Sequence, residues 1–420
     1  MSKALTKRLC AGAILSLLLS VQAFADLASL EYVTQSLKLP EREVSVRLPA
    51  GFELEFLTSL KEPRLMTFTD NGDLLIGSKS GNVYRLAPPY TDPQVLVHTG
   101  DYPHSVAVRE GELLIARSDG LYRAPYQPGE EQIDPRAVSL VARLPAGGGH
   151  SSRTVAIGPD NRVYLGLGIS GNCSDEYLSD SYPFQQRRGG ILVLDESGEE
   201  PKWKTFASGF RNPIGFDWHP RTDSLYAANN GPDHLGYDQP PEYFSRVTEG
   251  SFHGMPWFQF NGTGIRRDPC IERPPPRPIE EVIAPVATFP ARNAPMGVVF
   301  VPDGGLIPVL EGSAIVALHG SWGTRPAGGA RGDPAARRPP GLVAVRFSDG
   351  EAQLVDDLVR GFQLPDGGRW ARPVGVAIGP DGALYFTSDG GVNGLFRLAP
   401  LRSRSTDRKT GKTPEVRSSQ

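Results

Sequence analysis

Residues 372–387 read Arg-Pro-Val-Gly-Val-Ala-Ile-Gly-Pro-Asp-Gly-Ala-Leu-Tyr-Phe-Thr. Two apolar runs flank a polar turn at Pro380-Asp381-Gly382. The Asp-Gly pair readily adopts the positive φ angles that tight hairpin turns require. Short apolar runs with alternating side chains on both sides of such a turn are typical of β-strands. The stretch therefore predicts an antiparallel hairpin.

The same pattern occurs six times along the chain. The other five copies begin at Pro63, His104, Arg153, Asn212 and Ala294. The first and last copies continue into a further apolar strand, at residues 82–86 and 394–398. Strand-rich units that recur every ~40 to 80 residues are typical of propeller blades. We therefore predict an all-β fold, a six-bladed β-propeller of four-stranded antiparallel blades.

Ring closure should pair the last blade with the segment after Asp26, because closure removes exposed sheet edges. An eight-bladed ring and a pair of β-sandwiches are alternative architectures that fit six copies less well. Long insertions follow the fourth and fifth copies, at residues 232–293 and 323–341. Insertions of this kind tend to collect on one face of a propeller, which is often the binding face.

The start of the chain has the composition of a secretory signal peptide. Lys3, Lys7 and Arg8 precede an apolar run at residues 9–21, and Ala-Phe-Ala follows at residues 23–25. A basic start, an apolar run too short to span a bilayer and a small-residue cleavage site define such a signal. A membrane anchor is the alternative interpretation.

The predicted units are a signal peptide (residues 1–25), a propeller domain (26–400) and a disordered tail (401–420) rich in Ser, Thr, Lys and Arg. Cleavage would remove three positive charges and no acid, which changes the formal net charge from −3 to −6. A weakly acidic product argues against nucleic acid and anionic membranes as partners. We expect a periplasmic or secreted protein with no integral membrane segment in the mature chain. Its remaining cysteines, Cys173 and Cys270, could pair in an oxidising compartment, and the sequence leaves both states open.

The loops that precede the innermost strands of a propeller converge on its axis, and we call them the axial loops. Binding groups on rigid scaffolds concentrate in such loops. In this chain the axial loops carry mainly cationic and amide side chains: Arg64, His104, His150, Arg153, Arg211, Asn212, Asn293, His319 and Arg372. Converging arginines would form an electropositive funnel that suits an anionic cofactor or substrate.

Three features of these loops and the insertion after them have a specific chemical use. His150 follows three glycines, which let the backbone approach a ligand closely, and a neutral histidine there could accept a proton. Arg211 could bind an anion, and Gly231-Pro232 could present carbonyl oxygens to Ca²⁺. A turn histidine, a buried structural cation and an ordinary turn are the simpler interpretations, and the residues alone leave the choice open.

The sequence lacks the motifs of several other enzyme classes. Its cysteines and histidines do not have zinc spacing, and it contains neither Gly-x-Ser-x-Gly nor a phosphate loop. The run Gly147-Gly148-Gly149 is not a dinucleotide fingerprint, because no helical pattern follows it. These observations argue against zinc enzymes, α/β-hydrolases and nucleotide-binding enzymes.

A longer set of motifs carries a family resemblance. Residues 209–220 read Gly-Phe-Arg-Asn-Pro-Ile-Gly-Phe-Asp-Trp-His-Pro, and residues 230–231, 254–256, 319–322 and 372–376 add Asn-Gly, Gly-Met-Pro, His-Gly-Ser-Trp and Arg-Pro-Val-Gly-Val. In this order, over roughly residues 45–400, they resemble the glucose/sorbosone dehydrogenase family. Members of that family are exported quinoproteins that use pyrroloquinoline quinone.

The resemblance implies a six-bladed propeller that holds pyrroloquinoline quinone on its axis and oxidises an aldose or related sugar. His150 matches the family's general base, and Arg211 matches the arginine that stabilises the oxygen of the reduced quinone. Asn212, Arg372 and Arg325 are the remaining implied cofactor contacts. Electrons would then pass to an acceptor that the sequence does not identify.

The resemblance also implies a calcium ion that bridges the cofactor and the carbonyl oxygens of Gly231 and Pro232. Ca²⁺ would polarise the quinone as a Lewis acid. Four positions depart from the family pattern. Asn229, Tyr237 and Gly375 stand where related sequences commonly carry acids, and Gly323 stands where they continue with Asn-Arg after His-Gly-Ser-Trp, so Arg325 is displaced.

Two other functions are compatible with such a propeller. A metal-dependent hydrolase of the lactonase type would arrange Asn212, Asn229, Asn230 and Asp233 around a cation. That function needs a strong acidic ligand near the axis, and an asparagine at position 229 is a poor one. The third possibility is a non-catalytic propeller that binds a glycan or another protein.

Overall fold

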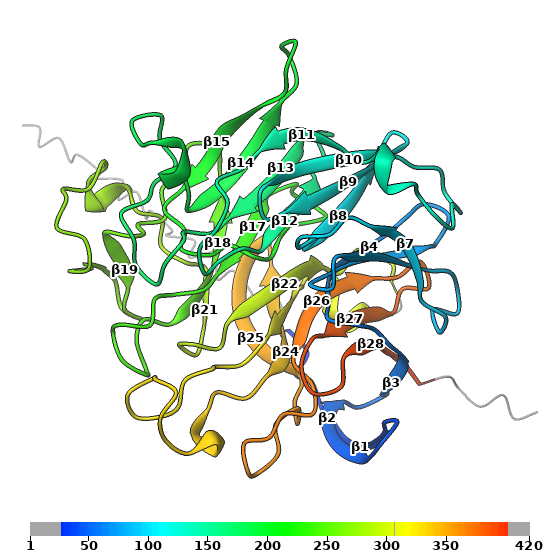
Figure 1. The fold of residues 1–420 in the computed structure, drawn as a ribbon. Coiled ribbons are helices and arrows are strands. Elements are labelled where there is room, and N and C mark those ends of the chain that lie inside the picture. The colour runs from blue at the N-terminus through cyan, green and yellow to red at the C-terminus, as the bar shows by residue number, and fades with distance from the viewer. Residues whose placement is uncertain (1–26, 306, 402–420) are drawn as a thin grey trace, which may run out of the picture.

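The computed structural model describes residues 27–305 and 307–401. The predicted signal peptide at residues 1–25 lies outside this part of the chain, as do residues 402–420 of the predicted tail. Strands and short 3₁₀ helices build both described ranges, without an α-helix in either. Six four-stranded antiparallel sheets form a ring, so the predicted six-bladed β-propeller is confirmed (Figure 1).

The first three blades take their strands in chain order, from the axis outward. Blade one contains β4 (Pro63–Phe68), β5 (Leu74–Ser78), β6 (Asn82–Leu86) and β7 (Gln94–His98). Blade two contains β8 (Ser105–Arg109), β9 (Glu112–Arg117), β10 (Gly120–Pro125) and β11 (Ser139–Arg143). Blade three contains β12 (Arg153–Ile157), β13 (Val163–Leu167), β14 (Gly190–Asp195) and β15 (Lys202–Ser208).

The last three blades include the long insertion and the ring closure. Blade four contains β16 (Phe216–Trp218), β17 (Leu225–Asn229), β18 (Glu242–Val247) and β21 (Ala287–Phe289). Blade five contains β22 (Pro295–Phe300), β23 (Ala314–Leu318), β24 (Gly341–Ser348) and β25 (Glu351–Val359). Blade six contains β26 (Pro373–Ile378), β27 (Leu384–Ser388), β28 (Gly394–Pro400) and β3 (Phe52–Ser59).

The remaining elements are short. Two hairpins stand outside the blades, β1 (Tyr32–Lys38) with β2 (Glu43–Pro49), and β19 (Phe258–Phe260) with β20 (Ile265–Arg267) inside the insertion of blade four. The 3₁₀ helices are η1 (Pro135–Ala137), η2 (Phe184–Gln186), η3 (Ile279–Glu281), η4 (Pro308–Leu310) and η5 (Pro334–Ala336). No helix in the two described ranges is both long and apolar enough to cross a membrane.

The ring closes through a strand from near the start of the chain. β28 pairs antiparallel with β3 from Gly394 opposite Ser59 to Pro400 opposite Phe52. The prediction that the last blade pairs with a segment from near the start of the chain is therefore confirmed, and the closing strand is β3. The β1–β2 hairpin precedes it and attaches to the end of blade five through paired backbone hydrogen bonds between Arg47 and Arg360.

The glycine that recurs near the start of the repeat allows neighbouring blades to pack closely. A Cβ added to Gly375 in β26 would lie 2.6 Å from the carbonyl oxygen of Arg64 in blade one. A Cβ added to Gly297 in β22 would lie 2.7 Å from the carbonyl oxygen of Val374 in blade six. Carbon and oxygen atoms cannot approach this closely without a shift of the backbone. The repeat therefore requires glycine at these positions because of packing between blades.

All six innermost strands run in the same direction along the axis, because each blade begins at the axis. Figure 1 shows β4, β8, β12, β22 and β26 gathered around the middle of the ring. The axial loops therefore meet at one end of the central channel, and the first hairpin turns of the blades meet at the other. The fold places the predicted site residues at a common opening.

Candidate functional site

The axial loops surround a pocket of about 400 Å³ at one end of the channel. Of the residues predicted from the sequence, His150, Arg211, Asn212, Gly231 and Arg372 line it. Further lining side chains come from every blade and from the insertion of blade four, and include Arg64, Lys79, Tyr102, Asp233, Glu242, Arg292, His319 and Trp322. The structure thus brings five of the seven predicted site residues together and leaves Pro232 and Arg325 out of the lining.

His150 has the geometry of a proton acceptor. Its Nδ1 lies 2.6 Å from the carbonyl oxygen of Ile169. A carbonyl oxygen only accepts, so Nδ1 carries the hydrogen and Nε2 keeps its lone pair. No hydrogen bond to Nε2 is formed within the described residues. Burial, and then the charge of Arg211, lower the pKa of His150 to about 4, so the imidazole is neutral at pH 7.

The loop that presents His150 is held by Arg153. This fully buried guanidinium donates from Nη1 to the carbonyl oxygen of His150 (2.7 Å) and from Nη2 to that of Pro145 (3.0 Å). His104 is also fully buried, and its Nδ1 donates to the carbonyl oxygen of Arg153 (2.9 Å). Two residues that the sequence placed on the axial loops therefore support the pocket from behind.

Arg211 is oriented by neutral acceptors. Its Nε donates to the carbonyl oxygen of Asn172 (2.8 Å), and its Nη2 donates to the Oδ1 of the same residue (3.0 Å). The carboxylate of Asp233 lies farther away, 3.8 Å from Nη2. The guanidinium is therefore held mainly by neutral acceptors, and Asp233, which also pairs with Arg292, neutralises it only in part, so charge remains available to an anion.

Asn229 explains one departure from the family pattern. It is buried, and its Oδ1 accepts the backbone N–H groups of both Arg211 and Asn212, each at 3.0 Å. One uncharged oxygen is enough to hold this turn, so an acid is not required. The neighbouring Asn230 donates through Nδ2 to the carbonyl oxygen of Pro295 (2.7 Å) and links blade four to blade five.

A buried carboxylate that the sequence analysis missed organises the opposite wall. Asp389 follows β27, and its Oδ2 accepts from Arg64 Nη1 at 2.5 Å and from Lys79 Nζ at 3.4 Å. Its Oδ1 accepts from Nε2 of His319 at 2.6 Å. Burial opposes ionisation, but the hydrogen bond from His319 and the charge of Arg64 hold the pKa of Asp389 well below its usual range.

His319 is not a free base, unlike His150. Its Nε2 donates to Asp389, and its Nδ1 accepts from Arg372 Nη2 at 2.8 Å. Burial lowers the pKa of His319 to about 4, so the ring is neutral with both nitrogens occupied. Arg372 also donates from Nε to the carbonyl oxygen of His319 (3.1 Å), which fixes the direction of its guanidinium.

The wall near Gly231 contains a second buried acid. Glu242 accepts the N–H of Gly231 through Oε2 and that of Ala294 through Oε1 (3.4 Å). Burial raises the pKa of Glu242 to about 7. Within the described residues, no hydrogen bond is formed to the carbonyl oxygens of Gly231 and Pro232. Oxygen donors suited to Ca²⁺ are therefore present, but too few for a complete protein shell, so a bound ligand would have to supply others.

The other side chains that could ligate a metal already form ion pairs, hydrogen bonds or a disulfide. Asp233 forms an ion pair with Arg292, whose Nε also donates to the carbonyl oxygen of Gly236 (2.8 Å). Within the described residues, the one cluster of three metal-ligating side chains is His234, Asp268 and Cys270, and Cys270 is bonded to Cys173. Neither arrangement is a metal centre on the axis.

Arg325 lies outside the pocket. It forms an ion pair with Asp238 at 3.5 Å, and its guanidinium packs over the ring of Tyr237. Arg338 joins the same group, 2.5 Å from Asp238 and 4.3 Å from the Tyr237 ring centroid. Tyr237 therefore packs against two arginines of the loop that follows Trp322, Arg325 and Arg338. These contacts hold Arg325 away from the axis.

The pocket is positively charged. The cationic side chains in its lining outnumber the carboxylates, with Arg64, Lys79, Arg211, Arg292 and Arg372 against Asp233 and Glu242. The buried Nε of Arg64 has no hydrogen-bond partner within the described residues. At the rim, Trp322 exposes 54% of its surface and donates from Nε1 to Asp233 Oδ2 (3.4 Å). The pocket thus offers donors to an anionic ligand and an aromatic surface at its mouth.

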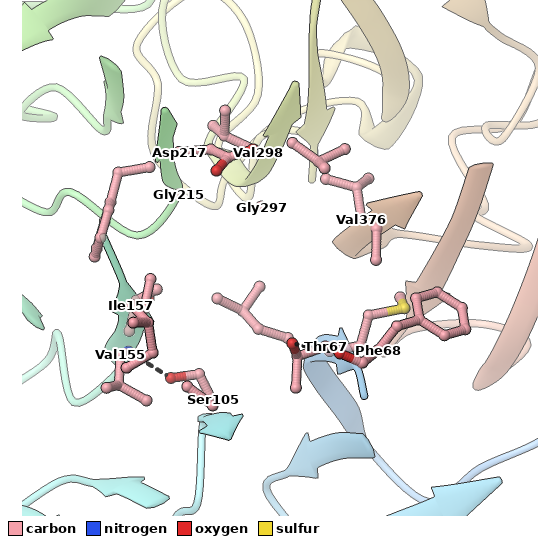
Figure 2. Close-up of a pocket in the computed structure, with 18 of the residues that line it drawn as sticks. Thr67, Phe68, Ser105, Val155, Ile157, Gly215, Asp217, Gly297, Val298 and Val376 are labelled. Carbon is pink, nitrogen blue, oxygen red and sulfur yellow. Dashed lines mark hydrogen bonds between the residues drawn. The ribbon is translucent and has the colours of Figure 1, made fainter. Parts of the chain in front are cut away.

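The cavity at the other end of the channel has a different character. It encloses about 490 Å³ between mainly apolar side chains, and Figure 2 shows Thr67, Ser105, Asp217 and Val376 among the residues around it. Asp217 is the single charged residue of its lining; the carboxylate accepts the N–H of Phe300 (2.7 Å), and burial raises its pKa to about 6. An acid in apolar walls does not suit an anion.

Apolar side chains separate the two cavities. Ile214 and Met296 line the cationic pocket, and Leu65 lines the apolar one. All three pack in a single buried cluster. The candidate site is therefore the cationic pocket at the axial-loop end.

Part of the chain matches a known family model. Residues 46–242 match the TrAA12-like family model. The match contains His150, Arg211, Asn212 and Gly231, and it confirms the resemblance that the motifs indicated. A protein of Borreliella burgdorferi described as uncharacterised is 23% identical over 398 residues, which cover 90% of this chain and 97% of that protein.

Two solved structures show the same fold. The calcium structure of the Trichoderma reesei carbohydrate-active enzyme of family AA12 is 17% identical, with a TM-score of 0.70, and the alignment covers 90% of this chain and 100% of that one. The holo form of the pyranose dehydrogenase PQQ domain from Coprinopsis cinerea is 18% identical, with a TM-score of 0.66, and the alignment covers 85% and 97%. At these identities the likeness establishes the propeller fold.

Proposed function

We propose that the protein is a sugar oxidoreductase, a dehydrogenase that transfers hydride from an aldose or related sugar to pyrroloquinoline quinone. The observation that carries this proposal is the free Nε2 of a neutral His150 in a pocket lined by an excess of cations. The T. reesei carbohydrate-active enzyme and the C. cinerea pyranose dehydrogenase domain, which share the fold, support a carbohydrate substrate and this cofactor.

The donor set of the pocket fits the cofactor. Pyrroloquinoline quinone carries several carboxylates and two quinone oxygens, and an excess of guanidinium groups together with the unpartnered Nε of Arg64 suits these acceptors. Arg211, Asn212 and Arg372 would hold it, with Arg64 as an additional contact. When bound, the quinone supplies the two-electron acceptor that protein side chains lack.

Calcium would occupy the wall next to Gly231. The carbonyl oxygens of Gly231 and Pro232 and the carboxylate of Glu242 are the hard donors that Ca²⁺ prefers. Their number leaves room for oxygen atoms of the cofactor. A cation there would also favour the ionised form of Glu242 over the neutral form that burial promotes.

His150 would act on the sugar hydroxyl. Nε2 accepts the proton of the sugar hydroxyl, and the hydrogen on the same carbon leaves as hydride to the quinone. The sugar thereby loses one proton and one hydride, and its carbon becomes a carbonyl. The hydrogen bond from Nδ1 to Ile169 holds the ring in the tautomer that this step requires. Arg211 would stabilise negative charge that develops on the acceptor, and its burial strengthens this effect.

The rim would bind the sugar. The exposed indole of Trp322 lies at the edge of the pocket, and aromatic faces pack against the C–H faces of pyranose rings. We extend the proposal to export: the disulfide between Cys173 and Cys270, with Cα atoms 6.4 Å apart, is suited to an oxidising compartment such as the periplasm. The electron acceptor is a partner still to be identified.

A lactonase-type hydrolase fits the pocket less well. Its required acid, Asp233, is paired with Arg292, and Asn229 and Asn230 are used in backbone hydrogen bonds. A catalytic metal bound by protein side chains alone would have too few ligands at the axis.

The test is reconstitution of the purified protein. Pyrroloquinoline quinone and CaCl₂ are added, quinone binding is measured by calorimetry, and dye reduction is followed with a panel of aldoses. His150→Ala should bind the quinone and lose turnover, whereas His98→Ala, at an exposed histidine bonded to Asn82, should keep both. Absence of quinone binding in the wild-type protein would refute the proposal, and metal-dependent lactone hydrolysis or glycan binding alone would favour the alternatives.

A further inference from the structure

One loop contacts both of the residues on which the proposed reaction depends. Residues 169–176 lie between β13 and β14, and we call them the anchoring loop. Its first residue, Ile169, accepts the hydrogen bond from His150 Nδ1 (2.6 Å), and its N–H donates to the carbonyl oxygen of Arg211 (2.8 Å). Asn172 accepts two hydrogen bonds from the Arg211 guanidinium.

Asn172 contacts three residues around the site, Arg211, Asp233 and His234. Its backbone carbonyl and its Oδ1 receive the fork of Arg211 at 2.8 and 3.0 Å. The same Oδ1 accepts the N–H of Asp233 at 2.7 Å, and Nδ2 lies 3.4 Å from Nδ1 of His234. A planar guanidinium is directed most strongly by two acceptors in its own plane. Asn172 provides these acceptors without the negative charge that would cancel the attraction of Arg211 for an anion.

Two further contacts hold the anchoring loop in place. At Cys173, next to Asn172, a disulfide joins it to Cys270 in the insertion of blade four. The buried carboxylate of Asp268 accepts from the N–H of Cys270 (3.0 Å) and bonds Nε2 of His234 (2.9 Å). Glu176 accepts from the N–H of Ser170 (2.5 Å), which joins the two ends of the loop. Asn172 is therefore exposed but not free to move independently.

We propose that Asn172 is a positioning residue that directs the Arg211 guanidinium into the pocket, and that the Cys173–Cys270 disulfide holds Asn172 in place. This inference deepens the proposed function and rests on it. It gives the disulfide a role in the site as well as in stability, because the bond lies one residue from the acceptors of Arg211.

Displacement of Arg211 has a consequence that does not require the cofactor. The charge of Arg211 contributes to the low pKa of His150, after burial. The other charged groups that influence His150 are Arg153, which also lowers its pKa, and Asp233, which raises it. When Arg211 swings away, the pKa of His150 should rise toward its ordinary value.

The experiment compares Asn172→Ala with Asn172→Asp and with the double variant Cys173→Ser/Cys270→Ser. Asn261→Ala is the matched control, because that side chain stabilises a surface turn between β19 and β20. Histidine side chains are labelled with ¹⁵N, and His150 is titrated by NMR in the protein without cofactor. The dissociation constant for pyrroloquinoline quinone is measured separately by calorimetry.

The expected result for Asn172→Ala is a higher pKa of His150 and a dissociation constant raised roughly tenfold to a hundredfold, as for lost hydrogen bonds to a charged group. Asn172→Asp should keep the orientation of Arg211 but weaken quinone binding through its negative charge. The cysteine variant should show the Asn172→Ala effects in weaker form, and the control should show neither.

An unchanged His150 titration in Asn172→Ala would overturn the positioning role, even if the variant melts at a lower temperature. If wild-type protein binds no quinone, the proposed function fails, and the titration still decides whether Asn172 directs Arg211.

Discussion

The replacement Asp389→Asn tests most directly whether the buried ion pairs of Asp389 stabilise the wall of the pocket. Asp389 is 4% exposed and accepts from Arg64 (2.5 Å), His319 (2.6 Å) and Lys79 (3.4 Å). An asparagine keeps one acceptor oxygen but leaves the buried Arg64 and the exposed Lys79 without their counter-ion, and it turns an NH₂ group toward a donor. Breaking a buried ion pair from one side costs about 3–5 kcal/mol, and the retained oxygen places this change near the lower end, at about 3 kcal/mol.

Spread over a propeller of this size, about 3 kcal/mol corresponds to a drop of about 4 °C in the midpoint of thermal unfolding. The pH dependence of this stabilisation follows from the linkage between protonation and folding. The pKa of Asp389 is lower in the folded protein than in the unfolded chain, so its stabilisation is fully present above the unfolded value of about 3.9 and is lost as the pH falls below it. The difference between wild type and variant should therefore be largest at neutral pH and shrink toward pH 3.

The assay is denaturant unfolding of both proteins followed by circular dichroism at pH 7 and pH 3. Asp303→Asn is the control, because its ion pair with Arg221 is exposed and should contribute little. Equal destabilisation by the two variants at pH 7, or a difference that does not shrink at pH 3, would show that the buried carboxylate of Asp389 does not stabilise the fold through its ion pairs. Asp389→Asn should also weaken quinone binding, since a neutral amide holds His319 less firmly than the carboxylate does, and His319 in turn accepts from Arg372.

Three further outcomes are expected. Because the pKa of His150 is about 4, about nine-tenths of it should be neutral at pH 5, and the kcat/KM profile should fall only below that pH; an acid limb near pH 6.5 would contradict the assigned environment. Gly375→Ala should destabilise the fold by roughly 2 kcal/mol or more in denaturant unfolding, because the added Cβ meets a backbone carbonyl at 2.6 Å, whereas Gly329→Ala, with open space, should be nearly neutral. Arg372→Ala should raise the calorimetric dissociation constant for the quinone by about tenfold or more, while Arg325→Ala should change it less than about twofold; the reverse order would return Arg325 to the site.

Local chemistry in the sequence was sufficient for the architecture. Asp-Gly turns and alternating apolar residues specify hairpins through short-range preferences, and their repetition sets the number of blades. Chain direction then places every axial loop at one end of the channel, which is why His150, Arg211, Asn212 and Arg372 could be predicted to converge. The closing strand β3 was less visible, because its partner is at the far end of the chain.

The partners of those residues could not be read from local patterns. Asp389 meets Arg64 across a separation of 325 residues, and Asn172 meets Arg211 across 39. Glu242 at the start of β18 and Arg292 after β21 also line the pocket, and no local motif marks either of them. The same packing moved Arg325 away from the axis, where Tyr237 and Asp238 hold it.

The repeat around residues 372–387 therefore specified the ring and the residues that face its axis, because hairpins and chain direction depend on neighbours in sequence. The protonation state of His150, the direction of Arg211 and the pairing of Cys173 with Cys270 arose from contacts between distant loops. Burial and long-range ion pairs set these properties, and both exist only after the blades have closed around the channel.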